Sequence, residues 1–191
     1  MIEVSEDTMN RIQTLLQGIE GAKGKVLRPA FGRAMQAGKT EAKRQALQTY
    51  HIKPGEFDSN TRVQYKGIND NPDEIIGSIN FSGNPIKLIK FNVTPKTVPK
   101  GNVTPTANVL RANAPVKFSR SNDVFVQQMV SGHIGIFQRE ETGKLKELYA
   151  PSGPKMVENE EVMGAIEDRV NEVINKRIDY EIERLLNKNG G

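Results

Sequence analysis

The stretch DVFVQQMVSGHIGIFQREETGKLKELYAPSGPKMV, residues 123–157, holds three strand patterns in succession, and two turns separate them. Each turn contains a glycine, Gly132 or Gly143, because glycine adopts the positive φ angles that tight turns need. A corner with two prolines follows at residues 150–154, and a helical pattern begins after it. The sequence therefore predicts an antiparallel β-meander that leads through a rigid corner into a helix.

Apolar residues recur every three or four positions through residues 159–187, as they do on one face of an α-helix. A helix of this length extends about 40 Å at 1.5 Å per residue. Two arrangements are compatible with the apolar stripe: a core helix lying across the sheet of its own chain, or a projecting helix that packs with neighbouring subunits. The stripe consists of Val162, Ile166, Val170, Val173, Ile174, Ile178, Ile182 and Leu185.

Further strand patterns precede the meander, at residues 61–66, 75–81, 86–91 and 116–119. Between the last two lies a segment rich in proline, asparagine and threonine, residues 92–115. Its prolines remove backbone donors from any regular ladder, so the segment predicts a long loop or an edge hairpin that packs on a partner. We expect it to be mobile or exposed in the isolated chain and ordered mainly by contact with another subunit or with a partner protein.

The first 55 residues contain two helical patterns. The first carries an apolar stripe at Met9, Ile12, Leu16 and Ile19. The second is predicted to begin near Pro29, since proline is tolerated in the first turn of a helix, and to stop before residues 52–55, where Pro54 and Gly55 end it. Its inner face is made mostly of small side chains: Ala30, Ala34, Ala37, Ala42, Ala46 and Tyr50.

Contiguous strands bracketed by helices, rather than alternating with them, are typical of the α+β class. We expect a largely antiparallel β-sheet flanked by an N-terminal basic helix and a long C-terminal amphipathic helix. A chain of 191 residues suits one structural unit. Its consecutive parts are a helical segment (residues 1–55), a β-domain (56–150) with the extended loop 92–115, and the corner with its helix (151–191).

Catalytic and ligand-binding motifs are poorly represented. The chain has no cysteine, which excludes disulfides, thiolate chemistry and cysteine zinc sites. Gly38, Lys39 and Thr40 resemble the end of a P-loop, but Arg33 stands where that motif needs a glycine. His51 and His133 lack a carboxylate or serine partner at motif spacing. We therefore expect no enzyme, no cofactor and no metal ion.

The sequence also predicts where the protein resides. No stretch approaches the roughly 18 apolar residues of a membrane span, and residues 1–7 lack the basic and apolar regions of a signal peptide. We expect no membrane partner and residence in a reducing cytoplasm.

Charge is distributed unevenly along the chain. Residues 21–53 carry eight Lys and Arg against Glu41 alone, a net charge of +7, whereas residues 155–188 have a net charge of −3. These charges form either solvated or mutually paired faces of one fold, or complementary surfaces between copies in a ring, with Glu172 or Glu183 facing Arg33 or Lys43 of a neighbour. The candidate interface comprises Arg28, Arg33, Lys39, Lys43, Arg44, Glu172, Ile174, Ile178, Ile182 and Glu183.

Several segments, in their order and spacing, resemble the minor tail protein Z family of phage tail-completion proteins. That family has a basic helix ending in a short Ile-Lys turn, which residues 40–53 match. The other matching segments are residues 82–91 (SGNPIKLIKF), 124–126 (VFV), 131–139 (SGHIGIFQR) and 148–154 (LYAPSGP). The similarity covers about residues 25–186. The chain departs from the family pattern at Ala150, where the family has glycine, and at Asn84 within the usual Gly-Lys turn.

The resemblance implies a non-enzymatic virion protein that acts late in tail assembly, at the head-proximal end, so that the tail joins a filled head. Together with the long apolar stripe and the opposite charges of the two helical segments, it predicts a homo-oligomeric ring, six-fold to match the symmetry general to phage tails. Its neighbours would be neck and tail proteins such as the connector or adaptor, the tail terminator or the tube. The protein would reside in the virion tail or neck, and in the host cytoplasm before assembly.

A second function class stays open, that of a non-specific nucleic-acid-binding accessory protein. The basic residues 21–53 suit contact with phosphate backbones, including DNA that passes through a ring. The segment lacks the interleaved aromatic side chains that single-strand binders use.

Overall fold

The computed structural model describes residues 6–66, 78–101, 103–118 and 123–189. The chain divides into two compact units, which do not follow the three consecutive segments expected from the sequence. The helical unit contains Met1–Ala42, Val63–Asn80 and Met163–Gly191. The β unit contains Lys43–Arg62 and Phe81–Val162.

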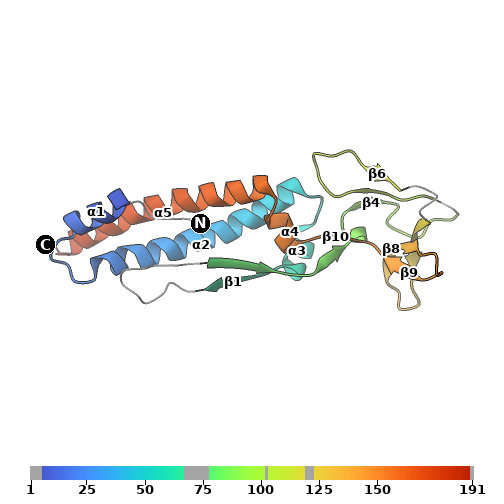
Figure 1. Ribbon diagram of the computed structural model, residues 1–191, viewed down its shortest axis with the longest axis horizontal. Coiled ribbons are helices and arrows are strands. Elements are labelled where there is room, and N and C mark those ends of the chain that lie inside the picture. The colour runs from blue at the N-terminus through green and yellow to red at the C-terminus, as the bar shows by residue number, and fades with distance from the viewer. Residues whose placement is uncertain (1–5, 67–77, 102, 119–122, 190–191) are drawn as a thin grey trace. The chain divides into compact units, whose positions relative to one another are not determined.

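Three helices build the helical unit: α1 (Glu6–Leu15), the larger part of α2 (Ala22–Thr49), and α5 (Glu160–Asn189) beyond its first turn. α2 and α5 lie side by side and run in opposite directions (Figure 1). An ion pair of 2.7 Å between Arg11 and Asp179 joins α1 to α5. The apolar core of this unit includes Ile12, Leu16, Val26, Leu27, Ala30, Phe31, Ala34, Ile166, Val170, Ile174, Ile178, Ile182 and Leu185.

Helix α2 begins at Ala22, several residues before the predicted start near Pro29, which lies inside the helix. A proline inside a helix leaves the carbonyl four residues earlier without its usual donor. The sequence prediction was wrong here because tertiary burial overrides that cost: Val26, Leu27 and Ala30, around the proline, are all buried. Burying one such aliphatic side chain contributes roughly 1.5–3 kcal/mol.

Helix α5 agrees with the helix predicted over residues 159–187. Its first turn is capped by Asn159, whose side-chain oxygen accepts hydrogen bonds from the backbone N–H groups of Glu161 (3.1 Å) and Val162 (3.4 Å). Seven of the eight residues of the apolar stripe are buried, and Val173 is half-buried. Of the two arrangements, the stripe therefore belongs to the core of its own chain, where helices rather than a sheet cover most of it.

The predicted meander is confirmed in the β unit. Strands β7 (Val124–Gln128), β8 (Ile134–Arg139) and β9 (Leu145–Glu147) form an antiparallel sheet in that order. The two turn glycines adopt the positive φ angles expected of them, 82° at Gly132 and 80° at Gly143.

The corner after the meander is a strand end followed by a short helix. Strand β10 (Tyr149–Ser152) pairs antiparallel with β3 (Pro85–Lys87), which leads into the 3-10 helix η1 (Leu88–Lys90). Helix α4 (Gly153–Val157) then begins, and the side chain of Ser152 accepts a hydrogen bond from the N–H of Lys155. Helix α3 (Pro54–Asn60) completes the helices of the described residues.

The fold class is α+β, as predicted, but the strands form several small sheets instead of one continuous sheet. Each pairing with a described register is antiparallel. Strands β1 (Arg62–Lys66) and β2 (Ser78–Ser82) form a two-stranded sheet. β2 matches most of the strand predicted over residues 75–81, and residues 75–77 of that prediction lie outside the described residues.

The proline-rich segment 92–115 contains a hairpin, one of the two predicted alternatives. Strand β4 (Asn92–Thr94) pairs antiparallel with β5 (Thr106–Asn108), and β5 pairs with β6 (Val116–Lys117). Val93 and Ala107 are buried in this sheet. The connection between β4 and β5 exposes Val98 and Val103 to solvent.

Candidate functional site

The basic residues of the candidate interface lie along α2. Arg28, Arg33 and Arg44 are exposed, whereas Lys39 and Lys43 are half-buried. Along the helix they alternate with the buried alanines at positions 30, 34, 42 and 46, and they are more exposed than those alanines. The helix therefore presents cations to solvent over much of its length.

Most of these cations already have partners within the chain. Lys43 forms an ion pair of 2.6 Å with Asp58 of α3, and Arg44 donates a hydrogen bond of 3.2 Å to Gln48. Arg28 and Lys39 also make interactions within the chain. Arg33 is exposed and forms no hydrogen bond or ion pair with another described residue.

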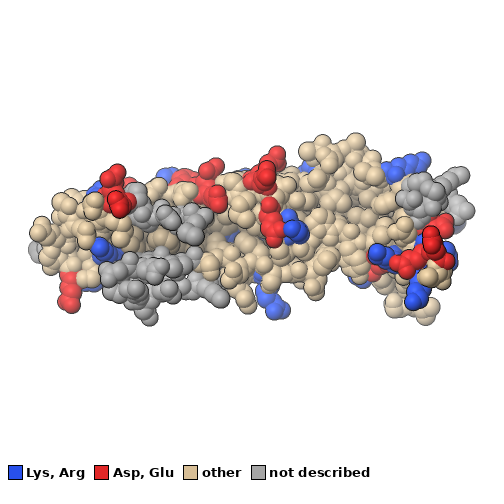
Figure 2. All heavy atoms as spheres, in the orientation of Figure 1, with Lys and Arg blue, Asp and Glu red and all other residues tan. Residues whose placement is uncertain are grey.

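Acidic side chains are spread along α5, at the top of the face seen in Figure 2. Glu172 lies between Arg169 and Lys176 of the same helix, with oxygen–nitrogen distances of 2.6 Å to each. Hydrogen bonds from Lys176 and Arg169 hold the pKa of Glu172 below its usual range. Glu183 is exposed and has no ion-pair partner among the described residues.

The three isoleucines assigned to the candidate interface are not at the surface. Ile174, Ile178 and Ile182 are each at most 3% exposed, inside the chain's own helical unit. A neighbouring subunit cannot contact them in this conformation, so we remove them from the candidate interface. Of the charged residues in the candidate interface, only Arg33 and Glu183 are exposed and form no hydrogen bond or ion pair with another described residue.

A buried acid on α5 was missed by sequence reasoning. Glu181 is only 1% exposed, and its two oxygens contact Arg177 (2.9 Å) and Arg184 (2.5 Å). The Arg177 guanidinium also lies over the ring of Tyr180, 4.4 Å from its centroid. Arginines four residues before and three after an acid are the available sequence signal for such a cluster.

A second missed cluster surrounds His133 at the start of β8. Its Nε2 atom lies 2.6 Å from Oε1 of Glu147 and 3.2 Å from Nζ of Lys87. One ring nitrogen can donate to the carboxylate or accept from the ammonium group, but not both. Sequence analysis found no carboxylate at motif spacing from this histidine, and the partner lies fourteen positions away, where the β8–β9 hairpin brings Glu147 to His133.

Glu147 also accepts a hydrogen bond of 3.3 Å from the hydroxyl of Tyr149. The negative charge of Glu147 raises the pKa of that tyrosine. The cluster thus ties β8, β9, β10 and β3 together through charged side chains.

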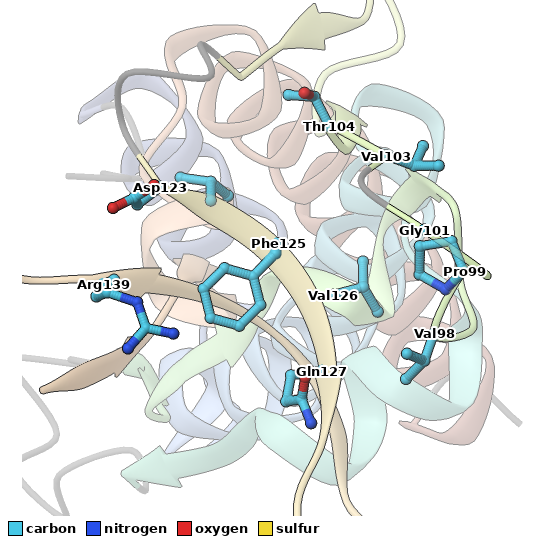
Figure 3. Close-up of a pocket in the computed structure, with 11 residues that line it drawn as sticks. Val98, Pro99, Gly101, Val103, Thr104, Asp123, Phe125, Val126, Gln127 and Arg139 are labelled. Carbon is cyan, nitrogen blue, oxygen red and sulfur yellow. The ribbon is translucent and has the colours of Figure 1, made fainter. Parts of the chain in front are cut away.

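A groove of about 590 Å3 lies between β7 and the connection from β4 to β5. Figure 3 shows Phe125 and Arg139 on one side of β7, and Val126 on the side toward Val98 and Pro99. The Arg139 guanidinium lies 5.7 Å from the centroid of the Phe125 ring. The remaining lining residues are Gly101, Val103, Thr104, Asp123, Val124 and Gln127.

In the described part of the chain, no group of three or more His, Cys, Asp and Glu side chains is arranged to hold a metal ion. Among the same residues, no helix is both long enough and apolar enough to span a bilayer.

Comparison of the chain with protein-family models, with curated proteins and with solved structures gives no match. Function is therefore inferred from the residues and their arrangement.

Proposed function

We propose that the chain is a structural virion protein of a tailed bacteriophage that acts in tail completion and head–tail joining, without enzymatic activity. The observation that carries this proposal is the order and spacing of the segments that resemble the minor tail protein Z family. Those segments coincide with defined elements: α2, the run from β3 to η1, strands β7 and β8, and the corner from β10 to α4.

In this proposal the chain assembles into a six-fold ring in the neck or proximal tail, next to other neck and tail proteins. The exposed charges support contact between copies through α2 and α5, since Arg33 and Glu183 have opposite sign and lack partners within the described residues. The basic side of α2 supports non-specific contact with DNA that passes the ring.

Deletion of the gene tests the role directly. We expect cells infected with the deletion phage to accumulate filled heads and separate tails, seen by electron microscopy, and expression of the chain in trans to restore joined particles. Normal numbers of joined, infectious particles without the protein would refute the role.

The alternative is a nucleic-acid-binding accessory protein that uses residues 21–53. The three exposed arginines on α2 favour it: Arg28, Arg33 and Arg44. If DNA binding is the main function, the logarithm of the DNA affinity falls with the logarithm of salt concentration with a slope of several units, about one for each phosphate contact. If assembly is the main function, ring-shaped particles form in negative stain without DNA.

A further inference from the structure

Strand β7 lies at the edge of its sheet as far as the described strands show. Among the described strands it pairs with β8 and has no neighbour on its other side. The ladder sets which backbone groups face that side: the N–H of Arg139 donates to the carbonyl of Asp123 (3.2 Å), and the N–H of Met129 donates to the carbonyl of His133 (2.7 Å). Because the direction alternates along an antiparallel strand, the N–H and C=O groups of Val124 and Val126 point away from β8.

The groove of about 590 Å3 runs along this free edge. Four consecutive residues of β7, from Val124 to Gln127, line it. Consecutive side chains of a strand point to opposite faces, so a groove lined by four in a row follows the edge of the sheet, not one face. Its volume lies within the range of roughly 300–1,000 Å3 that is typical of ligand sites.

The opposite wall of the groove is apolar. Val98 and Val103 are 44% and 48% exposed, and Pro99 stands between them. Large apolar side chains so exposed, across from backbone groups of β7 that have no backbone partner among the described residues, provide both elements of β-strand addition. Main-chain hydrogen bonds would hold an added strand, and alternate side chains would pack on the valines.

The charges around the groove favour an acidic occupant. The connection between β4 and β5 carries Lys96 and Lys100, both exposed, and no acid. Arg139 lines the groove on the β7 side, and Asp123 is the acid among the lining residues. A bound segment with Asp or Glu beside its apolar residues therefore meets an excess of positive charge.

We propose that this groove binds an extended segment of another protein, which adds to β7 as a further strand. The segment has β-branched apolar residues at alternate positions and at least one acidic residue. Its backbone pairs with Val124 and Val126, and its apolar side chains contact Val98 and Val103. The inference is separate from the tail-assembly role and does not depend on it.

The test is a selection for peptide ligands. A random library of short linear peptides, displayed on ribosomes, is selected on the full chain after depletion on the Val103→Asp variant. We expect enriched peptides to alternate Val, Ile or Thr with other residues and to contain Asp or Glu. No enrichment beyond the depleted background would overturn the proposal.

Variants of the protein then test the wall of the groove. Val98→Asp and Val103→Asp should each raise the Kd of an enriched peptide by about tenfold or more, because each removes an apolar contact and adds a like charge. Val116→Asp is the matched control, because this valine is 64% exposed on β6 and lies outside the groove. The Kd of the peptide for this variant should stay within about twofold of the wild-type value. Equal effects of the three variants would contradict the assignment.

Variants of the peptide test strand addition itself. N-methylation of the amides that face β7 should abolish binding, whereas N-methylation of the intervening amides should leave the Kd within about twofold. In the complex, amide hydrogen exchange at Val124 and Val126 should slow. Insensitivity to the position of the methyl group would show that no strand is added.

A measurement of self-association shows whether the segment in the groove comes from a second copy of this chain or from another protein. If the wild-type chain forms dimers or rings that the Val103→Asp variant does not form, the occupant is a second copy, and the proposal of a segment from another protein is wrong.

Discussion

Gly153 and Thr61 pack so closely that a Cβ atom on Gly153 would overlap the side chain of Thr61. Gly153 is the first residue of α4, and Thr61 follows the last residue of α3. The Thr61 hydroxyl oxygen is buried and has no hydrogen-bond partner among the described residues. The contact holds the start of α4 against the end of α3.

Gly153→Ala should therefore destabilise the fold by about 1–3 kcal/mol, because Thr61 or the corner must move to admit the methyl group. Urea denaturation followed by circular dichroism measures the change. Gly164→Ala is the matched control, since this glycine lies in α5 with no atom within 4 Å of an added Cβ. It should stabilise the protein by about 0.5–1 kcal/mol through helix propensity. A Gly153→Ala variant as stable as wild type would contradict the packing account.

Gly38 tests the contact between α2 and α5. An added Cβ would lie 2.7 Å from Cγ2 of Val170 and 3.0 Å from Cδ1 of Ile79. Gly38→Ala should lower the free energy of unfolding by about 1 kcal/mol, because overpacking exceeds the gain in helix propensity. In a Val170→Ala background, which removes the nearest contact and leaves that with Ile79, the same substitution should be less destabilising than in the wild type. Additive effects in this double-mutant cycle would show that the two side chains do not compete for space.

Arg111 holds the end of α2. Its Nε atom donates to the carbonyls of Leu47 (3.1 Å) and Tyr50 (3.2 Å), where a cation also suits the helix dipole. Arg111→Ala should destabilise the fold by about 1–2 kcal/mol. Arg111→Lys should recover part of this loss, since it keeps the charge without the forked donors. A neutral effect of Arg111→Ala in urea denaturation would contradict this role.

His51 should titrate below its ordinary range. Burial, and then the charge of Arg111, lower the pKa of His51. A histidine with a lowered folded-state pKa stabilises the protein above its unfolded pKa, and that contribution is lost as the pH falls toward the folded value. NMR titration of the ring should show the lowered pKa, with a rise in Arg111→Ala. An unchanged titration in the variant would exclude the influence of Arg111.

Glu172 should titrate below its ordinary range as well. The lowered pKa means that its ion pairs contribute to stability above the unfolded pKa of a glutamate, and that this contribution is lost as the pH falls through the folded pKa. Lys176→Gln should raise the pKa of Glu172, as measured by carboxyl NMR. No movement of that pKa would show that the pair seen at 2.6 Å does not persist in solution.

The proposed ring predicts a charge-reversal experiment. Arg33→Glu and Glu183→Arg should each weaken self-assembly, by about 1 kcal/mol per interface, because each places like charges across it. The double variant should restore assembly. Sedimentation velocity measures the assembled mass, and Lys188→Glu, an exposed charge later in α5, serves as the control. A wild-type chain that stays monomeric, or a double variant as weak as the singles, would refute the pairing.

The elements that the sequence predicts well are those that depend on neighbours along the chain. The stripe from Val162 to Leu185 specifies one helix, and the alternation around Gly132 and Gly143 specifies the meander. The start of α2 was not predictable in the same way, because the cost of Pro29 is local, whereas the burial of Val26, Leu27 and Ala30 that offsets it depends on tertiary packing. The pairing of β3 with β10 likewise joins residues far apart in sequence.

The candidate interface was likewise predictable only in the features that depend on neighbours along the chain. The spacing of the basic residues is enough to place them on one helix: Arg28, Arg33, Lys39, Lys43 and Arg44. Which of them remains unpaired depends on side-chain geometry, such as the contact of Lys43 with Asp58 in another helix. The sequence pattern of an apolar stripe is the same whether the stripe packs within its own chain or against a neighbouring subunit. Only the structure could therefore show that Ile174, Ile178 and Ile182 are buried within their own chain.

The chain passes between its two units four times, after Ala42, Arg62, Asn80 and Val162. Each passage falls within a helix or a strand instead of a linker. Neither unit is therefore encoded by one uninterrupted stretch of the gene. Recombination that transplants a single segment between genomes therefore cannot carry one whole unit and leave the other intact.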